Sequence, residues 1–388
     1  MTPRTGQLTA RPWRTAAWIF VATLLAGTLF SCASSRQSYS GPPSGHFDGQ
    51  RFHIDHQKTK SLGEVLAWQF NRESGGPWVR DMDAVQSALP PRRVEDDELR
   101  VTFVNHATVL IQTAGVNLLT DPIWSQRASP VSWAGPERYR PPGIGLSQLP
   151  PIDAVLISHN HYDHMDLETV SALQRQHDPL FIVPLGNCLY LDMGDSPRCH
   201  ELDWWQGFDL DSDVRISAAP VQHWSRRGLF DANKALWAGY MIDTESHRVF
   251  FAGDTGWGEH FAEIRERLGA PDLAILPIGA YLPRWFMAFQ HINPEEAVQA
   301  HIELGARRSM AIHFGTFRLA DDGQQQPVDE LRSSLAAAGL GDDSFWIPHN
   351  GEQRDAKQLG LQTHPAAAEN RSLPAGALAD ASLMPQAE

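Results

Sequence analysis

The feature that most constrains this chain is a cluster of metal-binding residue types directly behind an apolar run. Residues 154–158 have the length and composition of a buried strand, and His159-Asn160-His161-Tyr162-Asp163-His164 follows at once. Neutral imidazole and carboxylate groups are the usual protein ligands of zinc in sites that keep one position for water. A dense group of such residues at the mouth of a strand has little purely structural use. The cluster therefore predicts a metal centre at one edge of a sheet.

The remaining ligands of such a centre are expected where other strands end. His223, Asp254 and His313 each follow a separate strand-length run, and rigid strand ends are suitable places from which ligands converge. The predicted metal ligands are His159, His161, Asp163, His164, His223, Asp254 and His313. Other histidines, His106 among them, are interpreted as ordinary residues, whereas His291 stands out because it follows an irregular aromatic run.

Short apolar runs recur from residue 101 onward, each bounded by Gly, Pro, Asn or Asp, and they are candidate strands. They lie at residues 101–104, 109–112, 117–120, 154–158, 180–183, 214–218, 249–252, 273–277 and 309–312. Helical spacing appears at residues 167–174, 259–268, 294–304 and 329–338. Strands mixed with helices, with hairpin-like pairs among the strands, predict an α/β (α+β) fold of two packed sheets with helices outside.

The composition divides the chain into four expected parts. Residues 1–32 are interpreted as an export signal, residues 33–98 as a linker and an N-terminal extension packed on the core, and residues 99–352 as the main folded domain. Residues 353–388 are rich in Ala, Pro and Gln, and we expect them to be a disordered tail. The net charge of -14 argues against nucleic-acid binding, and no Gly-rich phosphate loop supports a nucleotide cofactor.

The N-terminal segment predicts where the protein is located. Three arginines precede an uncharged run at residues 16–30, which is shorter than the roughly 20 residues that cross a bilayer and is typical of an export signal. Leu29-Phe30-Ser31-Cys32 resembles a bacterial lipobox, so Cys32 is expected to carry a lipid anchor. A plain cleaved signal and an uncleaved anchor helix are the alternatives, and all three place the domain outside the cytoplasm. Ala33 after the cysteine favours a lipoprotein of the outer membrane over one of the inner membrane.

The two other cysteines are Cys188 and Cys199. In an oxidising compartment they are expected either to pair as a disulfide or to stay as two buried thiols, and the sequence leaves both outcomes open. Neither is expected to be a nucleophile, because no helper residue stands beside it in the sequence.

The HxHxDH cluster followed by a separate His, Asp and His resembles the metallo-β-lactamase superfamily, which implies a four-layered αββα sandwich with two metal ions at one edge of the sheets. Longer stretches are similar to the N-acyl-phosphatidylethanolamine-hydrolysing phospholipase D branch of that superfamily. They are Thr120-Asp121-Pro122, residues 150–164, Gly253-Asp254-Thr255-Gly256 and residues 277–287. The resemblance covers about residues 101–351.

The resemblance implies a role for each candidate residue. One zinc ion would be held by His159, His161 and His223, the other by Asp163, His164 and His313, with Asp254 bridging the two. Asp121 would orient a ligand histidine, and His291 would lie near the reacting group. Iron or manganese is also compatible with these ligand types. The chain departs from the family at Asn105, where Gly usually stands, and this leaves the shape of that loop open.

The implied reaction is hydrolysis of N-acyl-phosphatidylethanolamine, a membrane phospholipid, to phosphatidate and N-acylethanolamine, with Asp163 or His291 protonating the leaving oxygen. Arg226 and Arg227 are either contacts for the phosphate or a solvated basic pair. An aromatic segment is either an apolar wall for acyl chains and membrane, or ordinary core: Tyr281, Trp285 and Phe286.

The sequence leaves two other functions open. One is another hydrolase of the same fold, acting on a lactone, a lactam or a soluble phosphodiester. The other is an envelope lipoprotein whose metal site is not catalytic. A homodimer is compatible with the sequence, which does not fix the oligomeric state.

Overall fold

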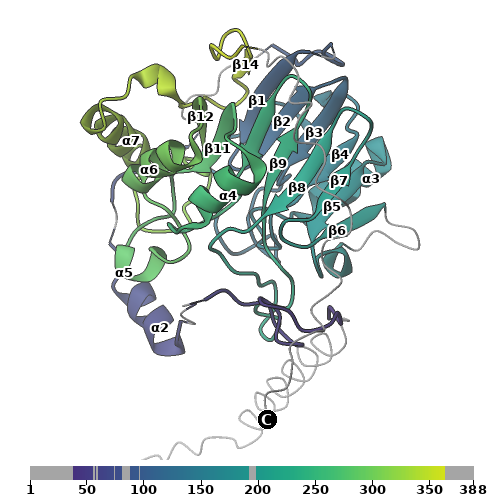
Figure 1. Ribbon diagram of the computed structural model, residues 1–388. Helices are drawn as coiled ribbons and strands as arrows, with labels where there is room; N and C mark the ends of the chain where they lie inside the picture. Colours follow the sequence, from purple (N-terminus) through teal and green to yellow (C-terminus); the bar gives the residue numbers. More distant parts are fainter. Residues whose placement is uncertain are drawn as a thin grey trace, which may run out of the picture.

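Two sheets packed face to face form the centre of the protein (Figure 1), as seen in a computed structural model that describes residues 38–362 except 56, 58, 59, 74, 81–87, 96 and 192–197. The expected export signal and Cys32 lie outside the described residues, as does the end of the expected tail. Helices cover the outer faces of both sheets, which is the predicted α/β sandwich. No helix within the described ranges is long and apolar enough to cross a membrane.

The first sheet has seven strands in the order β14-β1-β2-β3-β4-β5-β6. Their bounds are β1 Leu99–Asn105, β2 Thr108–Thr113, β3 Val116–Thr120, β4 Ala154–Leu156, β5 Leu180–Pro184, β6 Cys199–Leu202 and β14 Gln353–Asp355. Strands β14, β1, β2 and β3 pair antiparallel, and β3 through β6 pair parallel. Because β3, β4 and β5 run in the same direction, their carboxyl ends lie at one edge of the sheet.

The second sheet also has seven strands, in the order β13-β12-β11-β10-β9-β8-β7. Their bounds are β7 Gly207–Asp209, β8 Arg215–Ala219, β9 Gly239–Asp243, β10 Arg248–Phe251, β11 Leu273–Pro277, β12 Arg308–Ile312 and β13 Phe345–Trp346. Strands β10 through β13 are parallel, whereas β9 is antiparallel to both of its neighbours, β8 and β10. Strand β8 therefore runs in the same direction as β10 and ends at the same edge.

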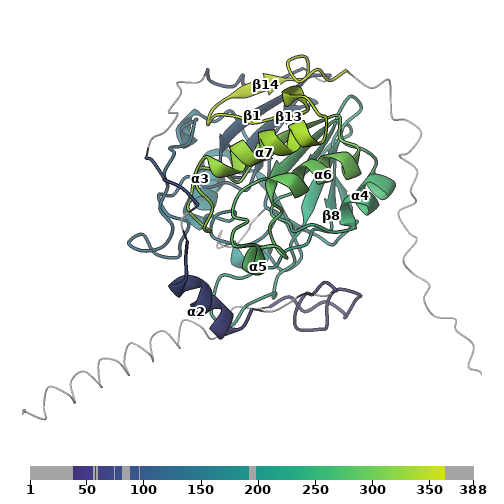
Figure 2. The ribbon, with the colours of Figure 1, turned by 90° about the vertical axis from the view of Figure 1, so that its left-hand side faces the viewer.

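The helices lie outside the two sheets, and those at residues 62–70 and 284–287 lie at one end of the sandwich (Figure 2). They are α2 Leu62–Phe70, α3 Leu167–His177, α4 His260–Leu268, α5 Arg284–Met287, α6 Pro294–Leu304 and α7 Gln326–Ala337, with short 3-10 turns η1 Leu146–Gln148, η2 Cys188–Tyr190 and η3 Asp342–Ser344. Helix α3 packs on the first sheet, and α4, α6 and α7 cover the second. Helix α6 begins as predicted, with Asn293 and Glu296 in a capping box and proline at the first helical position.

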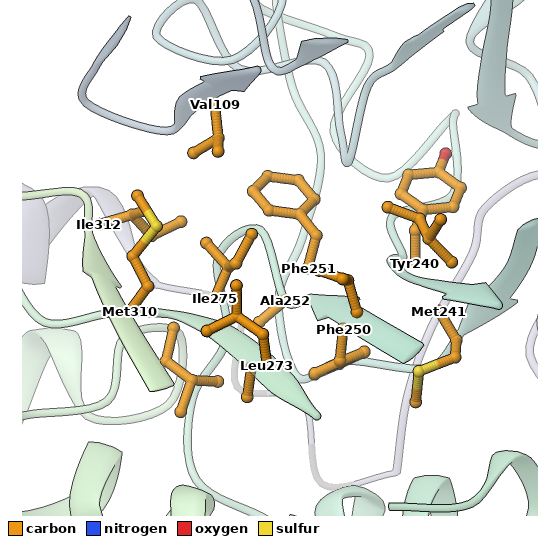
Figure 3. Close-up of a cluster of buried hydrophobic side chains, with 14 of the residues drawn as sticks. Val109, Tyr240, Met241, Phe250, Phe251, Ala252, Leu273, Ile275, Met310 and Ile312 are labelled. Carbon is orange, nitrogen blue, oxygen red and sulfur yellow. The ribbon is translucent and has the colours of Figure 1, made fainter. Parts of the chain in front are cut away.

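The main core lies between the sheets (Figure 3). Val109 of β2 points toward Phe251, Ile275 and Ile312 of the second sheet, and all four side chains are fully buried. Removing such a side chain from water contributes about 1.5 to 3 kcal/mol, so strands built of these residues are held rigidly. The loops that leave the strand ends consequently start from fixed positions.

The folded region extends past the boundary predicted at residue 352. Strand β14 pairs with β1, and Leu359 and Leu361 are buried in the main core, so residues 353–361 are part of the domain and not of a tail. Strand β14 was not predicted because its side chains are polar, and the backbone hydrogen bonds that hold an edge strand require no apolar pattern. At the other end, Phe47 and Phe52 from the N-terminal extension are also buried in this core.

Candidate metal centre

The predicted ligands meet where strands of both sheets end. The loop at residues 159–164 follows β4, His223 follows β8, Asp254 follows β10 and His313 follows β12. Their ligand atoms form groups in which all atoms lie within 4.8 Å of one another. The structure therefore brings all seven sequence-predicted residues to one point between the two sheets.

The first group consists of three imidazoles. His159 Nε2 lies 2.8 Å from His161 Nδ1, and His223 Nε2 lies 3.3 Å from the same nitrogen. His161 Nε2 is buried and makes no hydrogen bond. These three side chains are the set that the family resemblance assigned to one metal ion.

The second group combines carboxylates with imidazoles. Asp163 Oδ2 lies 3.3 Å from both His164 Nε2 and His313 Nε2. Asp254 reaches the same two rings, at 3.1 Å from His164 and 3.3 Å from His313. Its Oδ2 atom also lies 3.8 Å from His223 Nε2 of the first group. Asp254 is thus placed between the two groups, as a bridging ligand must be.

The buried polar atoms of this site fit a divalent metal. Asp254 Oδ1 and His164 Nε2 are buried without a hydrogen-bond partner, although such atoms in a protein interior are nearly always satisfied. Leaving them unsatisfied costs about 1 to 3 kcal/mol each. Imidazole nitrogens and carboxylate oxygens in this number and proximity match the donor set of two zinc-like ions.

The electrostatics of the first group favour the metal-binding form of histidine. Burial lowers the pKa of His161 to about 4 and that of His223 to about 3, and it lowers the pKa of His159 well below the usual range. All three rings are therefore neutral at pH 7, with a free nitrogen lone pair available to a cation.

The second group is charged. Burial alone would raise the pKa of Asp254, but the neighbouring imidazole of His164 holds it well below the usual range. Burial would likewise lower the pKa of His313, but Asp254 and Asp163 raise it to about 9. In the metal-free protein the carboxylates thus hold a proton on this ring, and a metal ion would compete with that proton.

Asp121 orients two of the ligand histidines. Its Oδ2 atom accepts hydrogen bonds from His164 Nδ1 and from Ser158 Oγ, both at 2.6 Å, and its Oδ1 atom accepts one from the backbone amide of Ser158 at 2.7 Å. The Ser158 hydroxyl uses its only hydrogen in the bond to Asp121, so its oxygen accepts a hydrogen bond from His159 Nδ1 at 2.9 Å. Both rings therefore carry a proton on Nδ1, which leaves Nε2 as the nitrogen that can bind metal. Although burial opposes it, Asp254 raises the pKa of His164 well above its usual value, so a metal ion would displace the proton on its Nε2.

The part played by Ser158 was missed in the sequence, although it stands directly before the ligand cluster. A further backbone contact fixes the first group from the other side, since His223 Nδ1 donates to the carbonyl oxygen of Gln290 at 2.9 Å.

Asp121 and His313 adopt left-handed backbone conformations, with φ of 33° and 61°. Strained conformations of this kind concentrate at functional sites.

His106 belongs to the site, and its interpretation as an ordinary residue was wrong. Its Nε2 lies 3.0 Å from Asp163 Oδ2, its ring centroid lies 4.1 Å from that of His313, and it joins the second group of candidate ligands. Burial lowers the pKa of His106 to about 3, so the neutral ring donates its Nε2 proton to Asp163. His106 directly follows β1, and this strand-end position was the signal that could have identified it.

The loop shape left open by Asn105 is now explained. Its Oδ1 atom accepts a hydrogen bond from Arg138 Nη1 at 2.7 Å, and its Nδ2 atom donates to the carbonyl oxygen of Ile123 at 3.2 Å. Arg138 is buried, and burial lowers its pKa to about 10. A glycine could not make either contact, so in this chain Asn105 ties the His106 loop to the segment after β3.

His291 lies at the rim of the centre. Its Nδ1 atom is 3.8 Å from Asp254 Oδ2, and burial lowers its pKa well below the usual range. Arg284 holds it in place by donating to the His291 carbonyl oxygen at 2.8 Å while pairing with Glu296 at 2.8 Å. Helix α5, the His291 loop and the start of α6 are thereby fixed together.

A cavity of about 320 Å³ opens onto the metal centre. Residues that line it include His161, Asp163, Asp254, His291 and Met287. A larger hollow of about 820 Å³ adjoins it and shares Tyr162, Arg227 and Gly228 with it, but none of the predicted metal ligands lines that hollow. We place the chemistry in the smaller cavity because the ligand atoms lie in its wall.

The predicted substrate arginines differ in what they contact. Arg227 Nη1 donates to the carbonyl oxygens of Asn160 at 3.0 Å and Met165 at 2.7 Å, and its guanidinium lies over the ring of Tyr162. Arg227 therefore ties its own loop to the ligand loop. Arg226 donates through Nε to the carbonyl oxygen of Gly228 at 2.7 Å, and it lines the cavity.

The aromatic segment is largely packed into the protein. Tyr281 is 2% exposed and donates to Glu330 at 2.7 Å, and Phe286 is 7% exposed and stacks on Trp68 with ring centroids 4.8 Å apart. Of the two alternatives left open by the sequence, these two residues fit ordinary core packing, because their rings are covered. Trp285 is 62% exposed and remains available.

Of the two outcomes left open for the cysteines, the structure contains the disulfide. Cys188 in η2 and Cys199 in β6 are bonded, with a Cα–Cα distance of 6.0 Å. The bond links the edge strand of the first sheet to the loop after β5.

The chain belongs to the metallo-β-lactamase superfamily, because the family described as "Beta-lactamase superfamily domain" matches residues 116–314. That span contains every predicted metal ligand and six strands of the second sheet, β7 through β12. The fold, the family and the cluster of candidate ligands together define a hydrolase of metallo-β-lactamase fold.

Individual relatives narrow the comparison. The chain is 39% identical over 290 residues to "N-acyl-phosphatidylethanolamine-hydrolyzing phospholipase D 1" of Caenorhabditis elegans, which covers 70% of this chain and 82% of that protein. It is 32% identical to "N-acyl-phosphatidylethanolamine-hydrolyzing phospholipase D, mitochondrial" of Saccharomyces cerevisiae, over 73% of this chain and 65% of that protein. A shorter match, 36% identical over 102 residues, covers 26% of this chain and 75% of "Outer membrane protein RomA" of Klebsiella pneumoniae.

Among solved structures, the isothiocyanate hydrolase from Delia radicum gut bacteria has a TM-score of 0.53 at 20% identity, covering 66% of this chain and 98% of that one. This similarity supports the shared fold alone.

Proposed function

We propose that the protein is a zinc-dependent phosphodiesterase of the phospholipase D type, which hydrolyses N-acyl-phosphatidylethanolamine or a similar phospholipid to phosphatidate and N-acylethanolamine. The observation that carries the proposal is the meeting of two ligand groups at Asp254, in the wall of a cavity. The similarity to the worm and yeast enzymes supports the choice of substrate.

Two zinc ions bound by the two ligand groups would supply Lewis acidity that makes water acidic and offsets the charge on a phosphodiester. The residues of the chain provide the orientation and the proton transfer. Asp121 and Ser158 hold the ligand rings in one tautomer, and His106 holds Asp163. A preorganised set of this kind avoids reorganisation during the reaction.

Of the two residues predicted to protonate the leaving oxygen, His291 fits better. Asp163 is ionised and hydrogen-bonded to His106, whereas the ring of His291 is neutral and lines the cavity. In the proposed step, water attacks phosphorus, its proton passes to His291, and the bond from phosphorus to the ethanolamine oxygen breaks. That oxygen then takes the proton from His291, so charge and atoms balance.

Exposed apolar side chains on α2 and α5 support the proposal that the substrate comes from a membrane. Phe70 is 84%, Trp285 is 62% and Leu66 is 45% exposed, and the helices that carry them are joined by the stack of Trp68 on Phe286. Figure 1 shows α2 and α5 at the same end as the first described residues. A lipid on Cys32, shortly before those residues, would hold this end against a bilayer and raise the local concentration of the enzyme at its substrate.

The test is product analysis by mass spectrometry. Residues 33–388 loaded with zinc are incubated with micellar N-acyl-phosphatidylethanolamine, and an Asp254→Asn variant is the control. We expect phosphatidate and N-acylethanolamine from the first protein and neither from the second. If the metal-loaded protein leaves the lipid intact but cleaves a lactone or a soluble phosphodiester, the fold and site stand and the substrate proposal falls.

A further inference from the structure

We propose that Lys60, from the N-terminal extension, binds an anionic oxygen of the substrate phosphate at the mouth of the metal cavity. The identity of that anion rests on the proposed function, but the presence of an anion site does not. Lys60 lies outside residues 116–314, which the superfamily match covers. It therefore belongs to a part of the chain that the superfamily match does not describe.

Lys60 lies beside the segment that forms the cavity wall. Its Nζ atom is 3.7 Å from the ring centroid of Phe286, and the next residue, Met287, lines the cavity. The same helical turn leads to His291, whose amide donates to the Met287 carbonyl oxygen at 3.0 Å. The charge of Lys60 also contributes to lowering the pKa of His291. The ammonium group thus lies against the segment that leads to His291.

The ammonium group lacks an anionic partner in the described part of the chain. Its one close contact there is the face of Phe286, and no described residue accepts a hydrogen bond from it. The carboxylate of Glu64 raises the pKa of Lys60, but it belongs to the capping box of α2. There it accepts hydrogen bonds from the Ser61 amide and hydroxyl at 2.8 Å each. Burial lowers the pKa of Lys60 to about 8, so at pH 7 most molecules carry the charge.

A partly buried cation without a counter-ion is costly, and an anion that approaches it forms a strong, charge-assisted hydrogen bond. The arginines of the cavity differ from Lys60, because Arg226 and Arg227 each donate to backbone carbonyl oxygens, whereas no described residue accepts a hydrogen bond from Lys60. Among the described residues, Lys60 is therefore a cation near the cavity wall that makes no hydrogen bond and is available for a ligand phosphate.

The contacts of helix α2 fix the position of Lys60. Trp68 stacks on Phe286 and donates through its indole nitrogen to Asp321 Oδ2 at 3.1 Å. Arg72 pairs with Asp321 Oδ1 at 2.8 Å. Ser61, next to Lys60, is the N-cap of this helix. A preorganised side chain loses little conformational entropy when it binds a ligand, and this favours tight binding.

The test compares Lys60→Gln and Lys60→Arg with Lys357→Gln in zinc-loaded residues 33–388. Lys357 is an exposed lysine in the turn after β14 and is the matched control. Figure 1 shows β14 at the opposite end of the protein from α2. Calorimetry measures binding of inorganic phosphate and of dihexanoyl phosphatidate. We expect Lys60→Gln to weaken the binding of both about 10-fold, Lys60→Arg to retain most of it, and Lys357→Gln to change neither. A loss for phosphatidate alone would assign the site to a lipid phosphate.

A second measurement does not depend on a variant. Acetic anhydride labelling followed by mass spectrometry reports the reactivity of each lysine, and phosphatidate is expected to protect Lys60 but not Lys357. Equal affinity in wild type and Lys60→Gln, together with no protection, would overturn the inference. Lys60-dependent phosphate binding without cleavage of N-acyl-phosphatidylethanolamine would retain the anion site and reject the proposed substrate. Cleavage of N-acyl-phosphatidylethanolamine with an unchanged KM in Lys60→Gln would retain the proposed substrate and reject the anion site at Lys60.

Discussion

Replacing Asp121 by Asn tests whether the buried carboxylate sets up the metal centre. The variant keeps the volume of the side chain but removes the negative charge of the carboxylate, which accepts hydrogen bonds from His164 and Ser158. Without that acceptor, the preference of His164 for the tautomer with a free Nε2 is weakened. Loss of such an orienting group costs about 10- to 100-fold in metal affinity. We expect Asp121→Asn to fold and to bind zinc more weakly by this factor.

The magnitude can be read from thermal unfolding. At a free zinc concentration about 1,000 times the dissociation constant, binding stabilises the folded state by about 4 kcal/mol, and a 100-fold loss of affinity removes about 2.7 kcal/mol of this. With an unfolding entropy of about 2.1 cal/mol/K per residue and roughly 300 folded residues, that corresponds to a metal-induced rise in Tm that is smaller by about 4 °C. Each protein is measured with buffered zinc and with chelator, so the direct effect of the substitution is subtracted.

Asp272→Asn is the matched control for this prediction. Asp272 is also a buried carboxylate, but it bonds Arg248 and Arg307 just before β11, at the opposite end of that strand from the ligands. It should retain the full metal-induced rise in Tm. If Asp121→Asn gives the same rise as wild type, the carboxylate does not orient His164 and the account of the site is wrong.

Three further predictions follow from the same geometry. In chelator, the stabilisation that His313 contributes should be complete below about pH 6.5 and lost as the pH rises through about 9. His223 is buried and neutral, so it should make folding less favourable as the pH falls below about 6.5. Urea unfolding from about pH 5 to 10 measures both effects, and a free energy of unfolding that does not change with pH would contradict them. Trp285→Ala should reduce binding to phospholipid vesicles without changing the hydrolysis of a soluble substrate, and unchanged vesicle sedimentation would refute the membrane-facing role. Asn105→Ala should lower the free energy of unfolding by about 1 to 3 kcal/mol, because Arg138 then lacks a buried acceptor, and an unaltered urea midpoint would contradict this.

The ligand set could be predicted from the sequence because each ligand follows an apolar strand. That pattern is local: a run such as residues 309–312 is visible in the sequence, and the next residue, His313, is then a candidate. The same rule applied to His106 would have added it. It was set aside because one histidine after a strand carries little weight until its distance to Asp163 is known.

Elements that depend on long-range contacts could not be predicted in this way. Strand β14 is polar and is defined by its backbone pairing with β1. Helix α2 is held by the contacts of Trp68 and Arg72 with Phe286 and Asp321, which are far away in the sequence. The role proposed for Lys60 likewise becomes visible only when the extension is docked against the cavity wall.

The disulfide between Cys188 and Cys199 has a consequence for handling the protein. The bridge closes a loop with a sequence separation of 11 residues, and loss of a bridge of this length removes about 3 kcal/mol in the chain-entropy view. A preparation kept in strong reductant would therefore lose the covalent link that holds the edge strand β6 to the loop after β5. Protein made in a reducing host should be reoxidised before its stability is compared with that of variants.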